Sequence, residues 1–254
     1  AASVFAAMEV PVRISDAIVP TPAVSAAAKR LDAVGVVITA SHNPPEWNGY
    51  KIKAPFGGSA SQDQIAGIEE KLSQYDPALK PHPFRDYLHS GMIRELNLLD
   101  GYLDLIRDSI DLDAIRSAGI RLAHDPMYGS GSTVLKKLLG DSVTEIHAER
   151  NPLFGGIAPE PMEKNLKKLS DIILEHECDA GIANDGDADR VGMVDEEGKF
   201  VDSHRILSLL AKYLHIKKGM EGKIVKTFST TTMLDKQAVS YGLPLEVTPI
   251  GFKY

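Results

Sequence analysis

The sequence predicts consecutive three-layer α/β domains with mixed, mainly parallel sheets, and three observations favour this fold class. Short apolar runs alternate with helical stretches along the chain, which is the pattern of βαβ units. The 254 residues are enough for two or three compact domains. The hydrophobic content of 43% and the charged content of 25% are ordinary for a globular protein.

The first series of elements is expected within residues 1–97. Thr21, which is followed by proline, is typical of the capping residue at a helix start, so we expect a helix that Thr21 caps and that runs to residue 31. Residues 34–40 are uncharged and mostly β-branched, which favours a buried strand. Ser61 and Gln64 form a capping-box pattern. The helix that they begin has its apolar face on Ile65, Ile68 and Leu72.

A second and a third series follow with the same rhythm, and together they define the expected domains. In the second series we expect strands at 119–124, 143–148 and 179–183, helices at 130–139 and 162–176, and a strand-turn-strand at 191–201. In the third series we expect helices at 203–214 and 231–241 and strands at 223–228 and 245–248. The expected domains therefore span residues 1–97, 98–200 and 201–254.

Composition argues against several kinds of partner. The formal net charge of −7 disfavours nucleic acid, because phosphate backbones are bound by clustered Lys and Arg. The single cysteine, Cys178, excludes an internal disulfide framework and suits a reducing compartment, so we expect a cytoplasmic protein. No apolar run approaches the roughly 20 residues of a membrane span, and no basic-then-apolar leader opens the chain. We therefore expect no membrane partner.

Ser41 follows the expected strand 34–40, at the sheet edge where ligands and catalytic groups collect in open α/β sheets. The proline pair at 44–45 keeps the loop from continuing as strand or helix, so it can hold one hydroxyl in a fixed direction. Lys51 lies beyond an Asn-Gly turn signal and could fold back toward the serine. A plain polar turn stays open as an alternative. A Ser-His hydrolase is disfavoured, because His42 is adjacent to Ser41 and triads join residues distant in sequence.

A second group of polar residues follows the expected strand 179–183. Asp185, Asp187 and Asp189 alternate along the loop, and three such close carboxylates repel one another unless a cation lies between them. A hard divalent ion with oxygen ligands is the natural occupant, and Mg²⁺ is the usual one where phosphates are handled. Arg190 follows at once, with a planar fork that suits a pair of phosphate oxygens.

Three alternatives compete with this metal site. An EF-hand loop shares the Asp spacing, but Arg190 stands where that loop needs glycine, and the flanks are expected to be strands. A solvated acidic turn without an ion would not explain why an apolar strand leads into the loop. A phosphoaspartyl phosphatase also places an Asp-x-Asp pair after a strand. In such enzymes the two residues after the second Asp typically end in threonine, whereas Ala188 and Asp189 follow here.

Four further features are expected to be structural. The turn 129–131, which His124 is expected to face, is expected to cap the following helix rather than cradle a phosphate. Cys178 is expected to fill space in the core. Trp47 is expected to pack in its loop rather than stack on a sugar.

These segments together resemble the α-D-phosphohexomutases, the family of phosphoglucomutase and phosphomannomutase. Residues 39–44, Thr-Ala-Ser-His-Asn-Pro, resemble the family's phosphoserine loop, and residues 185–190, Asp-Gly-Asp-Ala-Asp-Arg, resemble its metal loop. The Pro-Thr-Pro-Ala-Val-Ser run at 20–25 and the closing run at 248–254 also fit. The order and separation of the four segments match the family across nearly the whole chain.

The resemblance implies a four-domain architecture around a central cleft. This chain would contain most of the first domain, all of the second and the opening of the third, without the fourth, phosphate-binding domain. The chain begins without an initiator methionine and stops after a strand-like segment, so we expect both ends to be cuts in a longer polypeptide. The fragment alone is expected to be inactive.

The resemblance also implies a reaction. Phospho-Ser41 would donate its phosphoryl group to a hexose phosphate, and the resulting hexose bisphosphate would return its other phosphoryl group, so that phosphate moves between the C1 and C6 hydroxyls. Mg²⁺ would be bound by Asp185, Asp187 and Asp189 together with Ser41. The alternatives are a phosphoaspartyl-type phosphatase and a non-catalytic metal-binding module.

Four other residues take roles from the same resemblance. Lys51 would be the general acid and base, Arg190 would bind phosphate oxygens, and His42 would orient the serine loop or a sugar hydroxyl. Lys253 would contact the substrate. The sugar itself, whether glucose, mannose or an amino sugar, and the oligomeric state are not indicated by this stretch of sequence.

Overall fold

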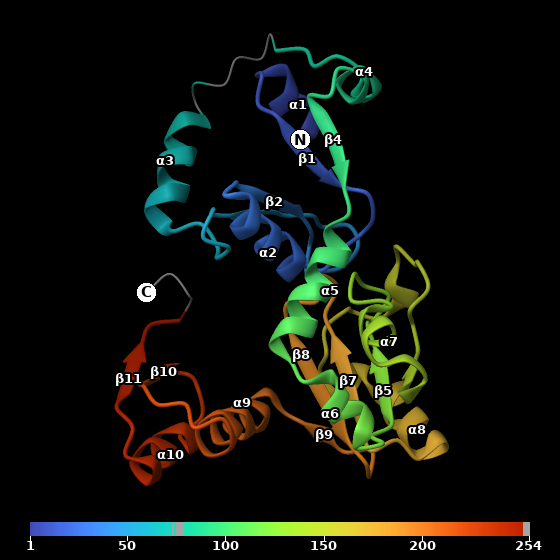
Figure 1. Ribbon diagram of the computed structural model, residues 1–254, viewed down its shortest axis with the longest axis vertical. Helices are drawn as coiled ribbons and strands as arrows, with labels where there is room; N and C mark the ends of the chain where they lie inside the picture. The colour runs from blue at the N-terminus through green and yellow to red at the C-terminus, as the bar shows by residue number, and fades with distance from the viewer. Residues whose placement is uncertain (73, 75–78, 251–254) are drawn as a thin grey trace. The chain divides into compact units, whose positions relative to one another are not determined.

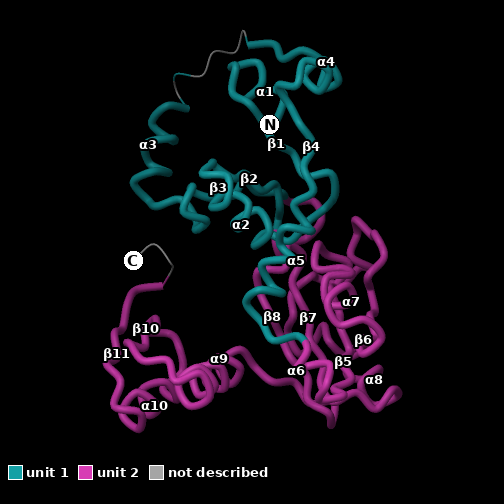
Figure 2. Tube along the Cα trace, in the orientation of Figure 1, with its two compact units in different colours: residues 1–40, 48–112 teal, residues 41–47, 113–254 magenta. Residues whose placement is uncertain are grey.

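The computed structural model describes residues 1–72, 74 and 79–250 of the chain (Figure 1). The chain forms two compact units, coloured separately in Figure 2. The first unit consists of residues 1–40 and 48–112, and the second of residues 41–47 and 113–254. The short segment 41–47, which carries Ser41, is therefore grouped with the second unit although the chain on both sides of it belongs to the first.

Within the described residues, the first unit contains two small sheets with helices packed on them. Its elements are α1 (Ala2–Ala7), β1 (Val12–Ser15), α2 (Thr21–Leu31), β2 (Gly35–Ile38), β3 (Tyr50–Lys53), α3 (Gln62–Leu72), α4 (Phe84–His89), β4 (Ile93–Leu96) and α5 (Leu98–Ser109). β1 pairs with β4 in parallel, and β2 pairs with β3 in antiparallel. Helices α1 and α4 pack on the first of these sheets and α2 on the second. One core cluster is formed by Ala6, Tyr87 and Ile93.

The sequence predicts two helix starts in this unit. The capping box of α3 is confirmed, because Ser61 N donates to Gln64 Oε1 over 2.8 Å and Gln64 N donates to Ser61 Oγ over 3.3 Å. The prediction that Thr21 caps α2 is wrong by one residue, since Pro20 holds the capping position and the helix begins at Thr21 itself. Buried alanines on one face of α2 let it lie close against α5 and β2.

The second unit is built on a five-stranded mixed sheet with the order β6-β5-β7-β8-β9. Its elements are α6 (Leu112–Ser117), which begins at the last residue of the first unit, β5 (Leu122–Asp125), α7 (Val134–Leu139), β6 (Val143–Glu145), α8 (Lys167–His176), β7 (Ala180–Asn184), β8 (Val191–Asp195) and β9 (Phe200–Val201). Strands β6, β5 and β7 are parallel, and β8 and β9 continue the sheet in antiparallel fashion. Helix α8 packs on β5 and β7, with Leu169 and Ile173 fully buried between them. The carboxyl ends of β6, β5 and β7 therefore lie at one edge of this sheet.

Two helices of this unit are shorter than predicted. The helix expected at 130–139 begins only at Val134, because Met127, Tyr128 and Thr133 all have positive φ angles and hold the preceding segment in turns. The helix expected at 162–176 is a 3₁₀ turn at Glu163–Asn165 followed by α8. The strand-turn-strand at 191–201 is confirmed as β8 and β9.

The remaining elements form a small parallel sheet with two helices. They are α9 (Ser203–Lys212), a π-helical turn (Tyr213–Lys217), β10 (Ile224–Thr227), α10 (Met233–Tyr241) and β11 (Leu245–Thr248), with β10 parallel to β11. Within the described ranges, no helix is long and apolar enough to cross a membrane. The predicted fold class, consecutive α/β domains with mixed, mainly parallel sheets, is confirmed.

Candidate metal centre at the Ser41 and Asp185 loops

The Asp loop is the turn between β7 and β8. Strand β7 is buried at alternate residues and leads the chain into the loop, and β8 returns antiparallel to it. Asp185 is fully buried and Asp187 is 4% exposed, while Asp189 is exposed. A solvated acidic turn does not bury two of its carboxylates, and an EF-hand loop is flanked by helices rather than by paired strands. Both of these alternatives are therefore wrong.

Asp185 is held in place by the loop's own backbone. Its Oδ1 accepts hydrogen bonds from the backbone N–H groups of Asp189 and Arg190, each over 3.0 Å. Burial raises the pKa of the Asp185 carboxyl, and the negative charge of Asp187 adds to this, whereas the hydrogen bond from Ser41 opposes it. The raised pKa means that the surroundings of Asp185 disfavour its charged form. A cation bound beside Asp185 would offset this effect.

Ser41 is brought to this loop from 144 residues away in the sequence. Its hydroxyl donates a hydrogen bond to Asp185 Oδ2 over 2.7 Å. Its backbone is left-handed, with φ of 56°, which turns the chain sharply after the strand that precedes it. Gly186 lies so close that a Cβ atom there would stand 2.3 Å from the Ser41 carbonyl oxygen. The serine loop and the Asp loop are therefore in direct backbone contact.

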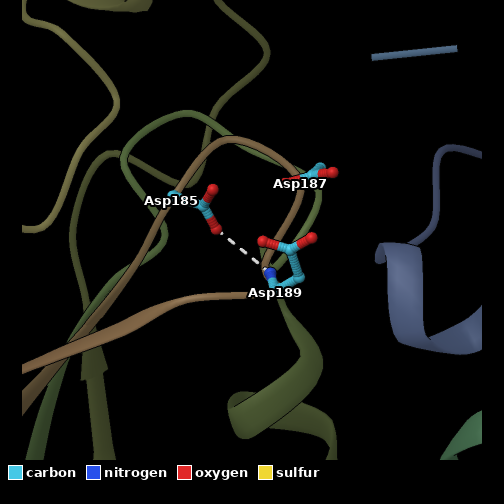
Figure 3. A group of neighbouring side chains, drawn as sticks. All are labelled: Asp185, Asp187 and Asp189. Carbon is cyan, nitrogen blue, oxygen red and sulfur yellow. Dashed lines mark hydrogen bonds between the residues drawn. The ribbon is translucent and has the colours of Figure 1, made fainter. Parts of the chain in front are cut away.

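The donor set fits a divalent metal ion. One carboxylate oxygen each from Asp185, Asp187 and Asp189 lies within 4.8 Å of the others, and Figure 3 shows the three side chains along the one loop. In an octahedral Mg²⁺ shell with Mg–O distances of about 2.1 Å, neighbouring ligand oxygens are about 3 Å apart and opposite ones about 4 Å apart. A divalent ion would also offset the repulsion between the buried carboxylates.

The turn at residues 129–131 supports this loop. The expectation that it caps the next helix is wrong, because the capping residue of α7 is Thr133, which makes no side-chain capping bond. Ser130 N instead donates to the Gly186 carbonyl oxygen over 2.9 Å, and a Cβ at Gly129 would lie 2.6 Å from that oxygen. Only glycine allows so close an approach, so the turn buttresses the Asp loop.

His42 and Arg190 share an acidic neighbour that the sequence did not indicate. Glu160 Oε1 lies 4.0 Å from His42 Nε2 and 3.9 Å from an Arg190 guanidinium nitrogen. Glu160 stands between two prolines in the segment before α8, and a carboxylate in so restricted a loop was the signal that could have revealed it. These long contacts hold the two side chains loosely near the Asp loop.

The other predicted site residues lie elsewhere or outside the described residues. Lys51 is half-buried on β3 in the first unit, where it pairs with Val37 of β2. Lys253 lies beyond residue 250 and so outside the described residues. The expectation that Trp47 packs in its loop is wrong, because its side chain is 68% exposed at the end of a turn closed by a hydrogen bond from Trp47 N to the Pro44 carbonyl. Cys178 is buried in the core, as expected, and burial raises its pKa.

Comparison with known proteins shows which family the chain belongs to. Three family models match successive parts of the chain: phosphoglucomutase/phosphomannomutase α/β/α domain I at residues 1–78, domain II at 100–198 and domain III at 202–254. A phosphoglucomutase/phosphomannomutase of Thermococcus kodakarensis is 33% identical over 238 residues, which cover 92% of this chain and 51% of the relative. The chain belongs to the phosphoglucomutase/phosphomannomutase family. The resemblance to the α-D-phosphohexomutases is thereby confirmed.

Other relatives of the chain carry different substrate names. A phosphoglucosamine mutase of Methanococcus vannielii is 32% identical and covers 92% of this chain and 52% of its own. A phosphopentomutase of Thermococcus kodakarensis is 30% identical and covers 92% and 50%. The crystal structure of a Thermus thermophilus protein described as a phosphomannomutase matches with a TM-score of 0.88 and 35% identity, over 98% of this chain and 56% of that one. The chain thus spans about half the length of the relatives that it matches.

Proposed function

We propose that this chain is the phosphoserine and metal-binding part of a sugar-phosphate mutase, an isomerase that moves a phosphoryl group between the C1 and C6 hydroxyls of a hexose phosphate. The observation that carries the proposal is the hydrogen bond from the Ser41 hydroxyl to buried Asp185, within a carboxylate group that fits a divalent ion. A nucleophilic oxygen beside such an ion is an arrangement suited to phosphoryl transfer.

Ser41 is the proposed carrier of the phosphoryl group. Phospho-Ser41 gives its phosphoryl group to a free hydroxyl of the hexose phosphate, and the hydroxyl proton passes to a base, for which we propose Lys51. The hexose bisphosphate then returns its other phosphoryl group to the Ser41 oxygen while the acid returns a proton to the sugar oxygen that is left behind. Phosphate has then moved between the two sugar hydroxyls, and phosphoserine is restored.

The remaining side chains bind and orient. Arg190 has a planar fork that can bind two phosphate oxygens, and it lies directly after the Asp loop. His42 follows Ser41, and its buried Nδ1 has no hydrogen-bond partner among the described residues, so this nitrogen suits the orientation of a sugar hydroxyl or the serine loop. We assign substrate contact to Lys253 from the resemblance of its segment alone.

Mg²⁺ is the proposed ion, bound by Asp185, Asp187, Asp189 and Ser41. When bound there, it supplies positive charge that stabilises negative charge building up on the transferring group. The carboxylates of Asp185 and Asp187 are buried in the loop, and a cation bound between them would offset the cost of burying their negative charges.

We also propose the substrate of the enzyme, its location, its domain bounds and its need for a longer chain. The names of the relatives divide among glucose, mannose, glucosamine and pentose phosphates. We propose glucose or mannose phosphate, a cytoplasmic location, and domains at 1–97, 98–200 and 201–254. Since the chain spans about half of its relatives, we propose that turnover requires the longer protein and that this part alone is inactive.

The decisive experiment follows the phosphoryl group in the longer mutase. Intact-protein mass should show a species heavier by about 80 Da, the mass of one added phosphoryl group, and Ser41→Ala should remove both this species and turnover. Lys51→Ala should retain the phosphoserine and lower kcat by roughly 10²- to 10⁴-fold, as expected when a proton-transfer group is lost. Turnover by the Ser41→Ala variant would contradict the proposal, and an unchanged kcat in Lys51→Ala would remove lysine from it.

A phosphoaspartyl phosphatase is the second candidate, and it fits less well. Its nucleophile would be Asp185, but both oxygens of that carboxylate already accept hydrogen bonds, from Ser41, Asp189 and Arg190. Such an enzyme would lose activity with Asp185→Asn and be indifferent to Ser41→Ala. Ser41→Ala therefore separates the two candidates, because it should abolish turnover in a mutase and leave a phosphatase active.

A further inference from the structure

We propose that His124 is a positioning residue for the Asp loop and acts through Asn184. The inference rests on the proposed metal site. His124 lies on β5, two strand pairings away from the hairpin strand β8, and its side chain is completely buried. A buried imidazole of this kind is not needed for a phosphoryl-transfer step, so its hydrogen bonds must be explained by what they hold.

The ring of His124 spans two neighbouring strands. Its Nδ1 lies 2.8 Å from Glu145 Oε1, at the end of β6, and its Nε2 lies 3.1 Å from Asn184 Oδ1, at the end of β7. Because β5 lies between β6 and β7 in the sheet, the histidine joins the carboxyl ends of three adjacent strands. Glu145 Oε1 also accepts from the Thr133 N–H over 3.0 Å, so the far end of this connection is itself anchored.

Asn184 carries the connection into the Asp loop. Its Nδ2 donates to the carbonyl oxygen of Arg190 over 3.0 Å. Because that carbonyl can only accept, the amide nitrogen must face it, and the amide oxygen must face His124. His124 Nε2 therefore donates to Asn184 Oδ1. This hydrogen bond fixes the orientation of the amide, with its oxygen toward His124 and its nitrogen toward Arg190.

One amide thus ties the two ends of the metal loop together. Asn184 immediately precedes Asp185, and the Arg190 carbonyl closes the loop at its other end. The Asp185 carboxylate accepts hydrogen bonds from the N–H groups of Asp189 and Arg190. Its orientation therefore depends on the position of Arg190, the residue whose carbonyl Asn184 holds. Without His124, the Asn184 amide could rotate, and the carboxylates would lose their shared geometry. Substituting a residue that does not bind the metal but orients its ligands through hydrogen bonds typically lowers metal affinity roughly 10- to 100-fold.

The test measures metal binding rather than turnover. Mg²⁺ affinity of this chain, or Mn²⁺ affinity by electron paramagnetic resonance, should weaken by roughly 10- to 100-fold in His124→Leu, which fills the same space but donates no hydrogen bond. Asn184→Ala should weaken it to a similar extent. If His124 acts through Asn184, the double variant should bind metal no more weakly than the single variant with the lower affinity. If the two residues acted independently, the fold-losses in affinity of the two single variants would multiply.

A matched control comes from the same unit. His147 Nδ1 lies within hydrogen-bond distance of buried Asp125 Oδ2, at 3.0 Å, and this partner lies outside the Asp loop. His147→Leu should therefore lower stability while leaving metal affinity unchanged in the folded protein. Unfolding followed by circular dichroism checks that each variant is folded under the binding conditions.

The outcomes separate the inference from the proposed function. If the unchanged chain binds neither Mg²⁺ nor Mn²⁺, the metal site is wrong and the inference falls with it. If the unchanged chain binds metal and folded His124→Leu binds it equally well, only the inference is overturned. Should His124→Leu fail to fold, Asn184→Ala decides, since unaltered affinity in that variant also overturns the inference.

Discussion

Among single residues, the position of Ser41 depends on a glycine in the facing loop. A side chain at Gly186 would collide with the Ser41 carbonyl oxygen, and the carbonyl oxygen of Gly186 accepts the N–H of Ser130. The Gly186 N–H donates to the Pro159 carbonyl oxygen over 3.2 Å, so this one residue contacts the segments of Ser41, Ser130 and Pro159. Such contacts leave no room even for a methyl group.

We predict that Gly186→Ala displaces Ser41 from Asp185. The added Cβ would stand 2.3 Å from backbone that cannot rotate away, so we expect about 1–3 kcal/mol of destabilisation and a large loss of phosphoserine formation. Urea unfolding and intact-protein mass measure the two effects. The control is Gly67→Ala in α3, where a Cβ meets no atom within 4 Å, and where alanine should be neutral or stabilise the helix by about 0.5–1 kcal/mol. Equal behaviour of the two variants would contradict the close contact.

Among the secondary-structure elements, helix α9 depends on a single charged capping residue. Asp202 accepts a hydrogen bond from the Arg205 N–H over 3.0 Å. This backbone hydrogen bond lowers the pKa of the Asp202 carboxyl, and the charges of Arg205 and His204 act in the same direction. The carboxylate also faces the positive end of the helix dipole.

We predict that this cap makes the stability of the chain depend on pH. Because the pKa of Asp202 is lower in the folded chain than in the unfolded chain, its contribution is fully present above the unfolded pKa of about 3.9 and is lost as the pH falls through the folded value. Asp202→Asn keeps an acceptor but no charge, so it should melt below the unchanged chain at a pH of about 7, and the gap should close in acid. Thermal melting by circular dichroism at several pH values measures the gap. A gap that does not vary with pH would show that the charge has no role.

At the scale of the whole chain, the segment 41–47, which carries Ser41, belongs to the second unit. Residues 41–47 have their contacts there, although the chain enters and leaves them from the first unit. Trp47, the chain's one tryptophan, lies in this segment, and because its side chain is 68% exposed, the anisotropy of its fluorescence rather than its emission wavelength reports whether the segment is ordered. The segment should lose its structure together with the sheet that carries the Asp loop.

We predict that a core substitution in the second unit shifts the unfolding transition seen by Trp47 fluorescence anisotropy. Leu169 is fully buried under the sheet, so Leu169→Ala should destabilise that unit by about 2–5 kcal/mol and move the transition to lower urea. Leu174, in the same helix but 58% exposed, supplies the control, and Leu174→Ala should produce a much smaller shift. A Trp47 transition that stays in place while circular dichroism detects unfolding of the Leu169→Ala variant would contradict this grouping.

Features that arise within a few residues of chain can be predicted from the sequence alone. The capping box at Ser61, the β8–β9 hairpin at 191–201 and the succession of an apolar strand and an acidic loop all follow from neighbouring residue types and the local backbone. For the same reason the three aspartates can be singled out as a group from the sequence, because they share one loop.

Tertiary packing, by contrast, selects which distant segments meet. The 2.7 Å bond from Ser41 to Asp185, the approach of Gly129 to Gly186, the neighbours of Glu160 and the His124 connection each depend on strand order and on close backbone packing. The helix α7 starts late for a related reason, since the segment before it has left-handed turns and is bonded to the Asp loop through Ser130 N and the Gly186 carbonyl oxygen. Residue types indicate what a side chain can do, but contacts between segments far apart in sequence are selected only when the whole sheet packs, and that selection is not recorded in any local pattern.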